Sequence, residues 1–293
     1  MLQRIHPNKP GGRQYTGRFA PSPTGPLHAG SLVAALASYL DARAHHGKWL
    51  VRLDDIDPPR QQAGAIESII HCLMKHGLEP DEVDYQSRHT TLYEHVLARL
   101  DQRGLLFRCT CTRATLGPNG VCIRDCQQST QQNSLATSLR VKVSPGTKIA
   151  FDDLIHGYQS CALFAQQTNF IVKRRDGLYA YQLASACDDG DSKITHVIRG
   201  VDLLDSTFKH IHLQQALGLK TPQYGHLPLV YGTDGSKLSK QTGAKALDNR
   251  YPEANLARAA AVLGLPPSPK SIRNVSQQLT WLTSQWRYDR VTR

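Results

Sequence analysis

The chain has 293 residues, enough to bury the core of one large domain or of two modest ones. Lys and Arg number 35 against 24 Asp and Glu, so the formal net charge is +11 and the pI is about 9.4, a balance that suits a polyanionic partner such as RNA without requiring one. Residues 1–14 are polar and basic, and no later run of about eighteen apolar residues could cross a bilayer, so we expect a cytoplasmic protein without a secretion signal or a membrane anchor.

The first predicted unit is a strand, a turn and a helix. The strand ends near Phe19, a turn rich in glycine and proline follows, and a helix begins after His28, with apolar residues at helical spacing over residues 31–46. A helix start offers unpaired N–H groups and a partial positive charge, so this turn has the outline of a phosphate site to which His28 adds hydrogen bonds. The alternative is a histidine that only caps the helix.

A second strand is predicted over residues 48–53, which completes the beginning of a βαβ unit. Ligands of such units lie beyond the carboxyl ends of the strands, where Asp54 begins an acidic group. Two further helices are predicted to cover the sheet, over residues 67–76 and 91–103.

The composition shifts from Cys109 onward to cysteines, glycines and a polar run, which predicts a loop-rich inserted subdomain over about residues 109–185. Within it, residues 139–143 alternate like a strand and residues 170–177 have the pattern of a hairpin. Residues 194–198 are then predicted to resume the main sheet.

The end of the chain is predicted to be helical. Pro252 opens one segment, and apolar residues at spacings of three and four between Ile272 and Trp286 form a single stripe in another. We expect this stripe to pack into the core.

Four of the seven cysteines cluster, as a C-x-C pair at Cys109 and Cys111 and a C-x3-C pair at Cys122 and Cys126. An odd total in a chain without a secretion signal argues for thiols or metal ligands over a disulfide framework. Four soft thiolates match tetrahedral zinc, so we predict one structural Zn²⁺ ion with no open coordination position. The alternative is four scattered reduced thiols.

A second short motif lies some two hundred residues after His28. A strand-like segment over residues 226–231 and a glycine-containing turn precede Lys237, Ser239 and Lys240 on one loop. Alone, such a run is usually a solvated basic turn. Together with His28, the two lysines indicate a site for a triphosphate.

These two motifs resemble those of the class I aminoacyl-tRNA synthetases, with residues 28–31 in the place of the HIGH-like motif and residues 237–241 in that of the KMSKS-like motif. The resemblance extends over most of residues 15–245. Segments 17–25, 51–57 and 198–202 are similar to the glutamate and glutamine branch of the class.

Within that branch, the resemblance is strongest to short, truncated members that attach glutamate to the queuosine base of tRNA(Asp). Residues 57–60, 109–113 and 238–241 carry this likeness. The resemblance implies an α/β fold: a Rossmann-like class I synthetase catalytic domain with a zinc-containing insertion and a short helical C-terminal segment. The expected parts are a polar N-terminal extension (1–14), the first half of the catalytic domain (15–108), the insertion on the acceptor side (109–185), the second half with the lysine loop (186–245) and the helical segment (246–293).

The resemblance also implies the catalytic residues. His28, Lys237 and Lys240 would position ATP, which enters with Mg²⁺, and stabilise charge during attack on its α-phosphorus. The implied ATP-binding residues are His28, Gly30, Ser31 and Lys240. Ser31 stands where the family's motif usually has a second histidine, so the lysine loop is expected to carry more of the transition-state charge.

A glutamate pocket needs cations for the carboxylates and an anion for the ammonium group. Arg18, Tyr181 and Arg199 match the family's carboxylate binders, and Ser22 and Asp54 match its ammonium contacts, although the family usually has a longer glutamate at the position of Asp54. The implied substrate-binding residues are Arg18, Phe19, Ala20, Pro21, Ser22, Asp54, Tyr181 and Arg199. Arg199 could instead form a surface salt bridge, and Tyr181 could belong to the core.

The resemblance therefore predicts a monomeric ligase that forms glutamyl-adenylate from L-glutamate and ATP without tRNA, and then transfers glutamate to the queuosine of tRNA(Asp). No domain that could reach an anticodon in the manner of ordinary glutamyl-tRNA synthetases is expected after residue 293. Three alternatives remain: a truncated glutamyl-tRNA synthetase that charges a tRNA 3′ end, a non-catalytic zinc-stabilised tRNA-binding protein, and a small-molecule adenylate-forming ligase.

Overall fold

The computed structural model describes residues 14–117, 120, 122, 126, 137–163, 169–230 and 245–291. None of the helices in these ranges combines the length and the apolar character that crossing a membrane requires.

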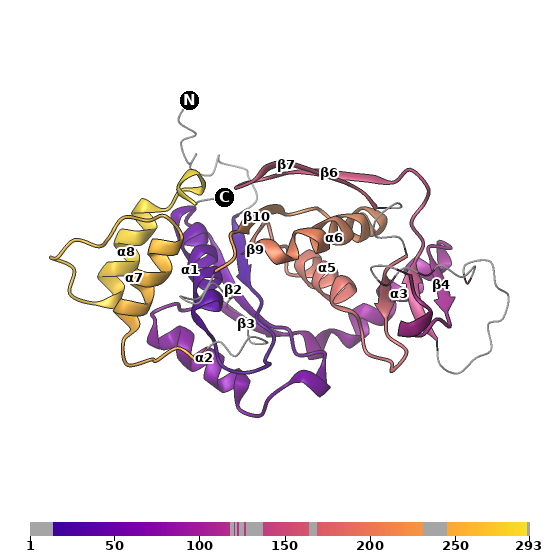
Figure 1. Cartoon of the computed structure of the whole chain (residues 1–293), viewed down its shortest axis with the longest axis horizontal. Coiled ribbons are helices and arrows are strands. Elements are labelled where there is room, and N and C mark those ends of the chain that lie inside the picture. The colour runs from indigo at the N-terminus through magenta and orange to yellow at the C-terminus, as the bar shows by residue number, and fades with distance from the viewer. Residues whose placement is uncertain are drawn as a thin grey trace.

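A sheet of five parallel strands forms the centre of the described chain, in the order β10-β9-β1-β2-β3 (Figure 1). The strands are β1 (Thr16–Phe19), β2 (Lys48–Leu53), β3 (Glu82–Tyr85), β9 (His196–Gly200) and β10 (Gln223–Leu227). The prediction of β2 is confirmed at both ends. The parallel sheet and its helices confirm the predicted α/β class.

Seven α-helices accompany the sheet in the described ranges: α1 (Ala29–Ala44), α2 (Ala65–Lys75), α3 (Thr90–Gln102), α5 (Tyr181–Asp191), α6 (Leu204–Leu217), α7 (Pro252–Val262) and α8 (Val275–Gln285). Short 3₁₀ turns lie at η1 (Pro58–Arg60), η2 (Gln86–His89), η3 (Arg113–Thr115), η5 (Val201–Leu203) and η7 (Tyr288–Arg290). The predicted helices over residues 31–46, 67–76 and 91–103 correspond to α1, α2 and α3.

The insertion contributes two small antiparallel sheets. One has the order β4-β5-β8, from β4 (Leu106–Cys109), β5 (Ser138–Val141) and β8 (Ile171–Lys173), and the other is a hairpin of β6 (Lys148–Asp153) and β7 (Gly157–Ala162) that runs over α6 in Figure 1. The hairpin predicted over residues 170–177 is a tight turn closed by one bridge, and β8 pairs mainly with β5. Both predicted boundaries of the insertion fall inside elements, because residue 109 is the last residue of β4 and residue 185 lies within α5.

The C-terminal helices pack on α1, at the side of the sheet away from β4 (Figure 1). Leu279, Leu282 and Trp286 are buried there, which confirms that the C-terminal apolar stripe belongs to the core. The buried carboxylate of Asp41 on α1 accepts hydrogen bonds from Trp286 Nε1 at 2.9 Å and from the Tyr288 hydroxyl at 2.7 Å. These contacts hold the C-terminal segment against the catalytic body.

Candidate active site

A cavity of about 360 Å³ lies at the carboxyl ends of the neighbouring strands β1 and β9. The chain order reverses here. From β1, the strands β2 and β3 follow on one side of the sheet, whereas β9 and β10 lie on the other side. Parallel sheets bind their ligands at such a switch point. The structure brings ten of the predicted residues together around this cavity: Arg18, Phe19, Ala20, Pro21, Ser22, His28, Gly30, Ser31, Tyr181 and Arg199.

His28 both caps α1 and lines the cavity. Its backbone is extended, and its ring Nδ1 accepts the backbone N–H of Ser31 at 3.2 Å. The two interpretations of this histidine are therefore compatible. Because Nδ1 is an acceptor, the neutral ring carries its proton on Nε2, as a hydrogen-bond donor.

Arg199, at the end of β9, is 4% exposed and surrounded by uncharged groups. Its Nη1 donates to the Tyr181 hydroxyl at 3.1 Å, and its Nη2 donates to Thr207 Oγ1 at 2.6 Å and to a backbone carbonyl at 3.3 Å. His210 and His226 also lie within 3.4 Å of the guanidinium, and burial lowers the pKa of both imidazoles. Within the described chain, no carboxylate pairs with this guanidinium.

Arg18, in contrast, has its own carboxylate. Its Nε donates to Asp189 Oδ1 and its Nη2 donates to Asp189 Oδ2, each at 3.1 Å. Arg52 Nη1 donates to the same carboxylate at 2.7 Å. Burial alone would raise the pKa of Asp189, but the two guanidiniums outweigh it and lower that pKa. The charge of Arg18 is therefore compensated by a buried carboxylate, whereas the part of the chain that the structure describes offers Arg199 none.

Asp54 lines a neighbouring cavity rather than the first one. Its Oδ1 accepts from Arg52 Nε at 2.8 Å. Burial raises its pKa to about 6, against the opposing effect of Arg52. A substrate ammonium group would compete with Arg52 for this carboxylate, whereas Ser22 lines both cavities.

The neighbouring cavity measures about 710 Å³ and opens between the main sheet and the insertion. It shares Ser22 and Tyr181 with the first cavity, and Arg140 and Phe170 of the insertion form part of its wall. Gln86 also lines it and is fully buried. Its amide nitrogen donates to Asp188 at 2.7 Å, while its Oε1 lacks a hydrogen-bond partner among the described residues.

Lys237 and Lys240 lie outside the described residues. On their N-terminal side, Val230 lines the first cavity. On their C-terminal side, Ala246 forms an antiparallel bridge with His28. The described chain therefore leaves the cavity before the two lysines and returns to it after them.

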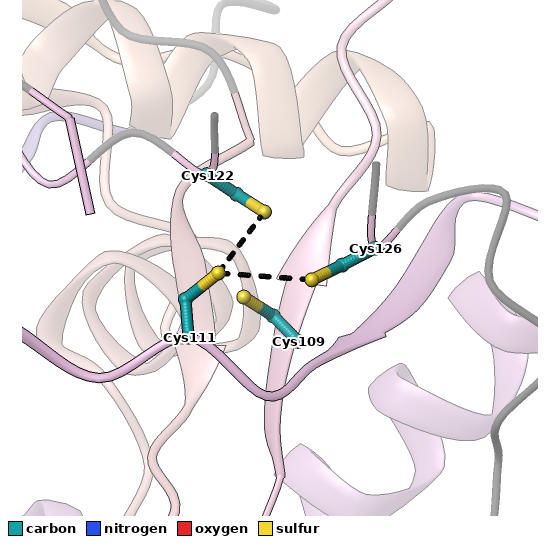
Figure 2. A group of neighbouring side chains, drawn as sticks. All are labelled: Cys109, Cys111, Cys122 and Cys126. Carbon is teal, nitrogen blue, oxygen red and sulfur yellow. Dashed lines mark hydrogen bonds between the residues drawn. The ribbon is translucent and has the colours of Figure 1, made fainter. Parts of the chain in front are cut away.

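The four clustered cysteines converge in the insertion (Figure 2). Their Sγ atoms all lie within 4.8 Å of one another, and Cys111 Sγ is 3.7 Å from the Sγ atoms of Cys122 and Cys126. Tetrahedral thiolates about 2.3 Å from a zinc ion lie about 3.8 Å apart. The donor set and its spacing fit a zinc ion, so the four cysteines can hold a metal.

The sequence motifs did not reveal the buried groups behind the two cavity arginines. These are Asp189 and its second partner Arg52 for Arg18, and Thr207 and His226 with Asp153 for Arg199. The sequence holds one local signal for them. Asp188 and Asp189 follow an apolar run in what becomes α5, where a buried charge requires a partner. Nothing local identified Arg18 as that partner, because it lies 171 residues away in the sequence.

The fold and the cavity define a class I synthetase catalytic domain. Residues 14–278 match the family model described as "tRNA synthetases class I (E and Q), catalytic domain". The chain is 46% identical to "Glutamyl-Q tRNA(Asp) synthetase" of Cupriavidus metallidurans, over 94% of this chain and 91% of that protein, and 45% identical to the protein of the same name from Neisseria meningitidis serogroup B, over 94% and 97%. The chain thus belongs to the glutamyl-Q tRNA(Asp) synthetase family within the class I (E and Q) synthetases, and it is a ligase.

A solved structure shares the fold. It is a glutamate tRNA ligase from Elizabethkingia meningosepticum in complex with its amino acid, with a TM-score of 0.79 and 24% sequence identity. The match covers 95% of this chain and 66% of that one, so the present chain spans about two thirds of the length of that ligase.

Proposed function

We propose that the protein activates L-glutamate with ATP to glutamyl-adenylate without tRNA, and transfers the glutamate to the queuosine base of tRNA(Asp). The observation that carries the first half is the buried guanidinium of Arg199 at the cavity wall, which has no carboxylate partner among the described residues. A buried cation without a counter-charge is costly, and a substrate carboxylate at the cavity wall would supply that charge. The names of the relatives support the substrate and the acceptor.

The first step joins a glutamate carboxylate oxygen to the α-phosphorus of ATP and breaks the bond to the pyrophosphate oxygen. Arg199 and Tyr181 would hold a carboxylate, and His28, Gly30 and Ser31 at the start of α1 would hold the phosphates. Mg²⁺ that enters with ATP would supply further positive charge to the phosphates.

We assign Lys237 and Lys240 to the departing pyrophosphate. The support for this assignment is that the described chain on both sides of them lies at the cavity, through Val230 and Ala246. Preorganised cations at the point where charge develops lower the barrier without a covalent protein group.

In the second step, a hydroxyl of the queuosine base attacks the acyl carbon, an ester forms and AMP leaves. We propose that the acceptor enters the second cavity, because this cavity shares Ser22 and Tyr181 with the first. The unpartnered Gln86 Oε1 favours a ligand with O–H or N–H donors. The net charge of +11 favours an RNA partner.

One Zn²⁺ ion held by Cys109, Cys111, Cys122 and Cys126 would be structural, because four thiolates fill its coordination sphere. It would tie the end of β4 to Cys122 and Cys126. The monomeric state and the cytoplasmic location stay predictions from the sequence.

Glutamate-dependent ATP–pyrophosphate exchange without tRNA tests the proposal. We expect exchange with glutamate and little with aspartate or glutamine, since the cavity must fit a γ-carboxylate at one length. Arg199→Lys should raise the KM for glutamate at least tenfold, because a flexible ammonium group cannot reproduce the directed hydrogen bonds that orient the planar guanidinium. Exchange that appears only after tRNA is added would refute tRNA independence, and its absence under all conditions would refute glutamate activation.

A further inference from the structure

We propose that Asp153, His226 and Thr207 form a relay that positions the Arg199 guanidinium at the cavity wall. This inference rests on the proposed role of Arg199 in binding a substrate carboxylate. It adds positioning residues that touch neither substrate, and it connects the insertion with the catalytic sheet.

The relay begins at a buried carboxylate in the insertion. Asp153 ends β6, and its Oδ1 accepts the backbone N–H groups of Ile155 and His156, each at 2.9 Å. Its Oδ2 lies 2.5 Å from His226 Nδ1 on β10. Both side chains are buried, so the backbone donors fix the orientation of the carboxylate that faces the ring.

The ring then has a defined direction. A carboxylate can only accept, so His226 Nδ1 carries the proton and donates it to Asp153. Burial holds this imidazole neutral near pH 7 by lowering its pKa. Its Nε2 is therefore a lone-pair acceptor, as in other histidines oriented by a carboxylate.

That acceptor faces the arginine. Thr207 Oγ1 lies 2.9 Å from His226 Nε2, and Arg199 Nε lies 3.4 Å from the same nitrogen. Thr207 Oγ1 also accepts from Arg199 Nη2 at 2.6 Å. The hydroxyl proton of Thr207 then has two possible acceptors, His226 Nε2 at 2.9 Å and the Leu203 carbonyl oxygen at 3.2 Å, and the ring nitrogen is the closer one. Every step thus runs from donor to acceptor, from the guanidinium to Asp153.

The relay fixes two of the three guanidinium nitrogens. Nη1 remains directed at the Tyr181 hydroxyl, which lines the cavity. A guanidinium fixed in this way loses little conformational freedom when a carboxylate arrives, so the relay should strengthen substrate binding rather than accelerate the chemical step.

Asp153→Asn is an almost isosteric test. The amide oxygen can keep the two backbone N–H groups, which turns the NH₂ group toward His226 Nδ1 and makes that nitrogen the acceptor. The proton then moves to Nε2 and opposes the N–H of Arg199. We expect the KM for glutamate in the exchange assay to rise about tenfold or more, with the KM for ATP near its wild-type value.

Two further variants separate positioning from folding. Thr207→Val removes one hydroxyl at nearly constant volume and should also raise the KM for glutamate. Asp41→Asn is the matched control, because Asp41 is a buried carboxylate that accepts from Trp286 and Tyr288 away from the cavity. It should lower the melting temperature and leave the KM for glutamate unchanged.

The ¹⁵N NMR shifts of His226 report the relay without any assay of activity. We expect a proton on Nδ1 in the wild type and on Nε2 in Asp153→Asn. The relay is overturned if the wild-type proton lies on Nε2, or if folded Asp153→Asn and Thr207→Val both bind glutamate with the wild-type KM. Absence of exchange in the wild type would overturn the proposed function instead, and the NMR result would still decide the geometry.

Discussion

Loss of the Asp189 carboxylate should strongly destabilise the catalytic domain. This carboxylate is fully buried and accepts three hydrogen bonds from Arg18 and Arg52. In Asp189→Asn, Arg52 keeps Asp54 at 2.8 Å, but Arg18 loses the one ion pair that the described structure gives it. Removing one partner of a buried pair costs about 3–5 kcal/mol. Because the amide oxygen still accepts one hydrogen bond, we expect the lower end, about 3 kcal/mol.

Chemical denaturation of the wild type and of Asp189→Asn at pH 7 measures this loss. The folded-state pKa of Asp189 is lowered, so its contribution is present above the unfolded pKa of about 4 and is lost as the pH falls through the folded value. The two stability curves should therefore differ by a constant amount above about pH 5 and converge only in acid.

The matched control is Asp248→Asn. Asp248 pairs with Arg250 at 2.7 Å, but both side chains are exposed, so we expect no measurable change in the free energy of unfolding. A loss below about 1 kcal/mol for Asp189→Asn, or a loss equal to that of the control, would refute the claim that the buried pair stabilises the cavity wall.

Three further predictions concern His28, the cysteine cluster and Asp54. His28→Asn keeps a good N-cap but removes the imidazole, so the melting temperature should stay unchanged while kcat for exchange falls about 100-fold. A lower melting temperature with an unchanged kcat would limit the role of His28 to capping the helix. The purified protein should carry about one zinc per chain by elemental analysis, and Cys111→Ser should carry markedly less; equal metal content would exclude the four-thiolate site. Asp54 should titrate near pH 6 in ¹³C NMR, against about 4 for an exposed aspartate. Because its pKa is raised in the folded state, it contributes stability below about pH 4 that is lost as the pH rises through 6. A titration midpoint near 4 would contradict its burial beside Arg52.

The elements that the sequence pattern predicted best are those whose apolar residues face one core. α1, β2, α2, α3 and the C-terminal helices have such a stripe or run, with α3 facing the second of the two main core clusters, and glycine or proline marks several of their ends. The motifs shared with the synthetase family add ten residues that line the first cavity, because these motifs lie where β1 and β9 end and where α1 and α5 begin.

Two elements had no comparable pattern. The strands of the β6–β7 hairpin alternate in burial, but their inward positions mix apolar Ile149 and Phe151 with polar Asp153 and Gln159, and Tyr158 faces outward at 65% exposure, so the sequence shows no clear apolar face. α6 buries Thr207, His210 and Gln214, which breaks the apolar stripe of an ordinary helix. In both cases tertiary contacts decide the structure, and these contacts are not local in the sequence.

Contacts between residues distant in the sequence also limited the prediction of the site. Arg18 and Arg199 look alike in the sequence, as single arginines near strand ends. Their difference lies in partners distant along the chain, Asp189 for one and Thr207 with His226 for the other. Which arginine has a charge available for a substrate is therefore a property of the fold.

Transfer of glutamate to the queuosine base, and not to the tRNA 3′ end, can be measured with four forms of one tRNA. Labelled glutamate and ATP are incubated with the protein and tRNA(Asp) in four forms: with queuosine or with guanosine at that position, and each with or without its 3′-terminal adenosine. We predict that label enters both queuosine-containing forms and neither guanosine form. Label that requires the terminal adenosine and is indifferent to queuosine would contradict the account and identify a synthetase that charges the tRNA 3′ end.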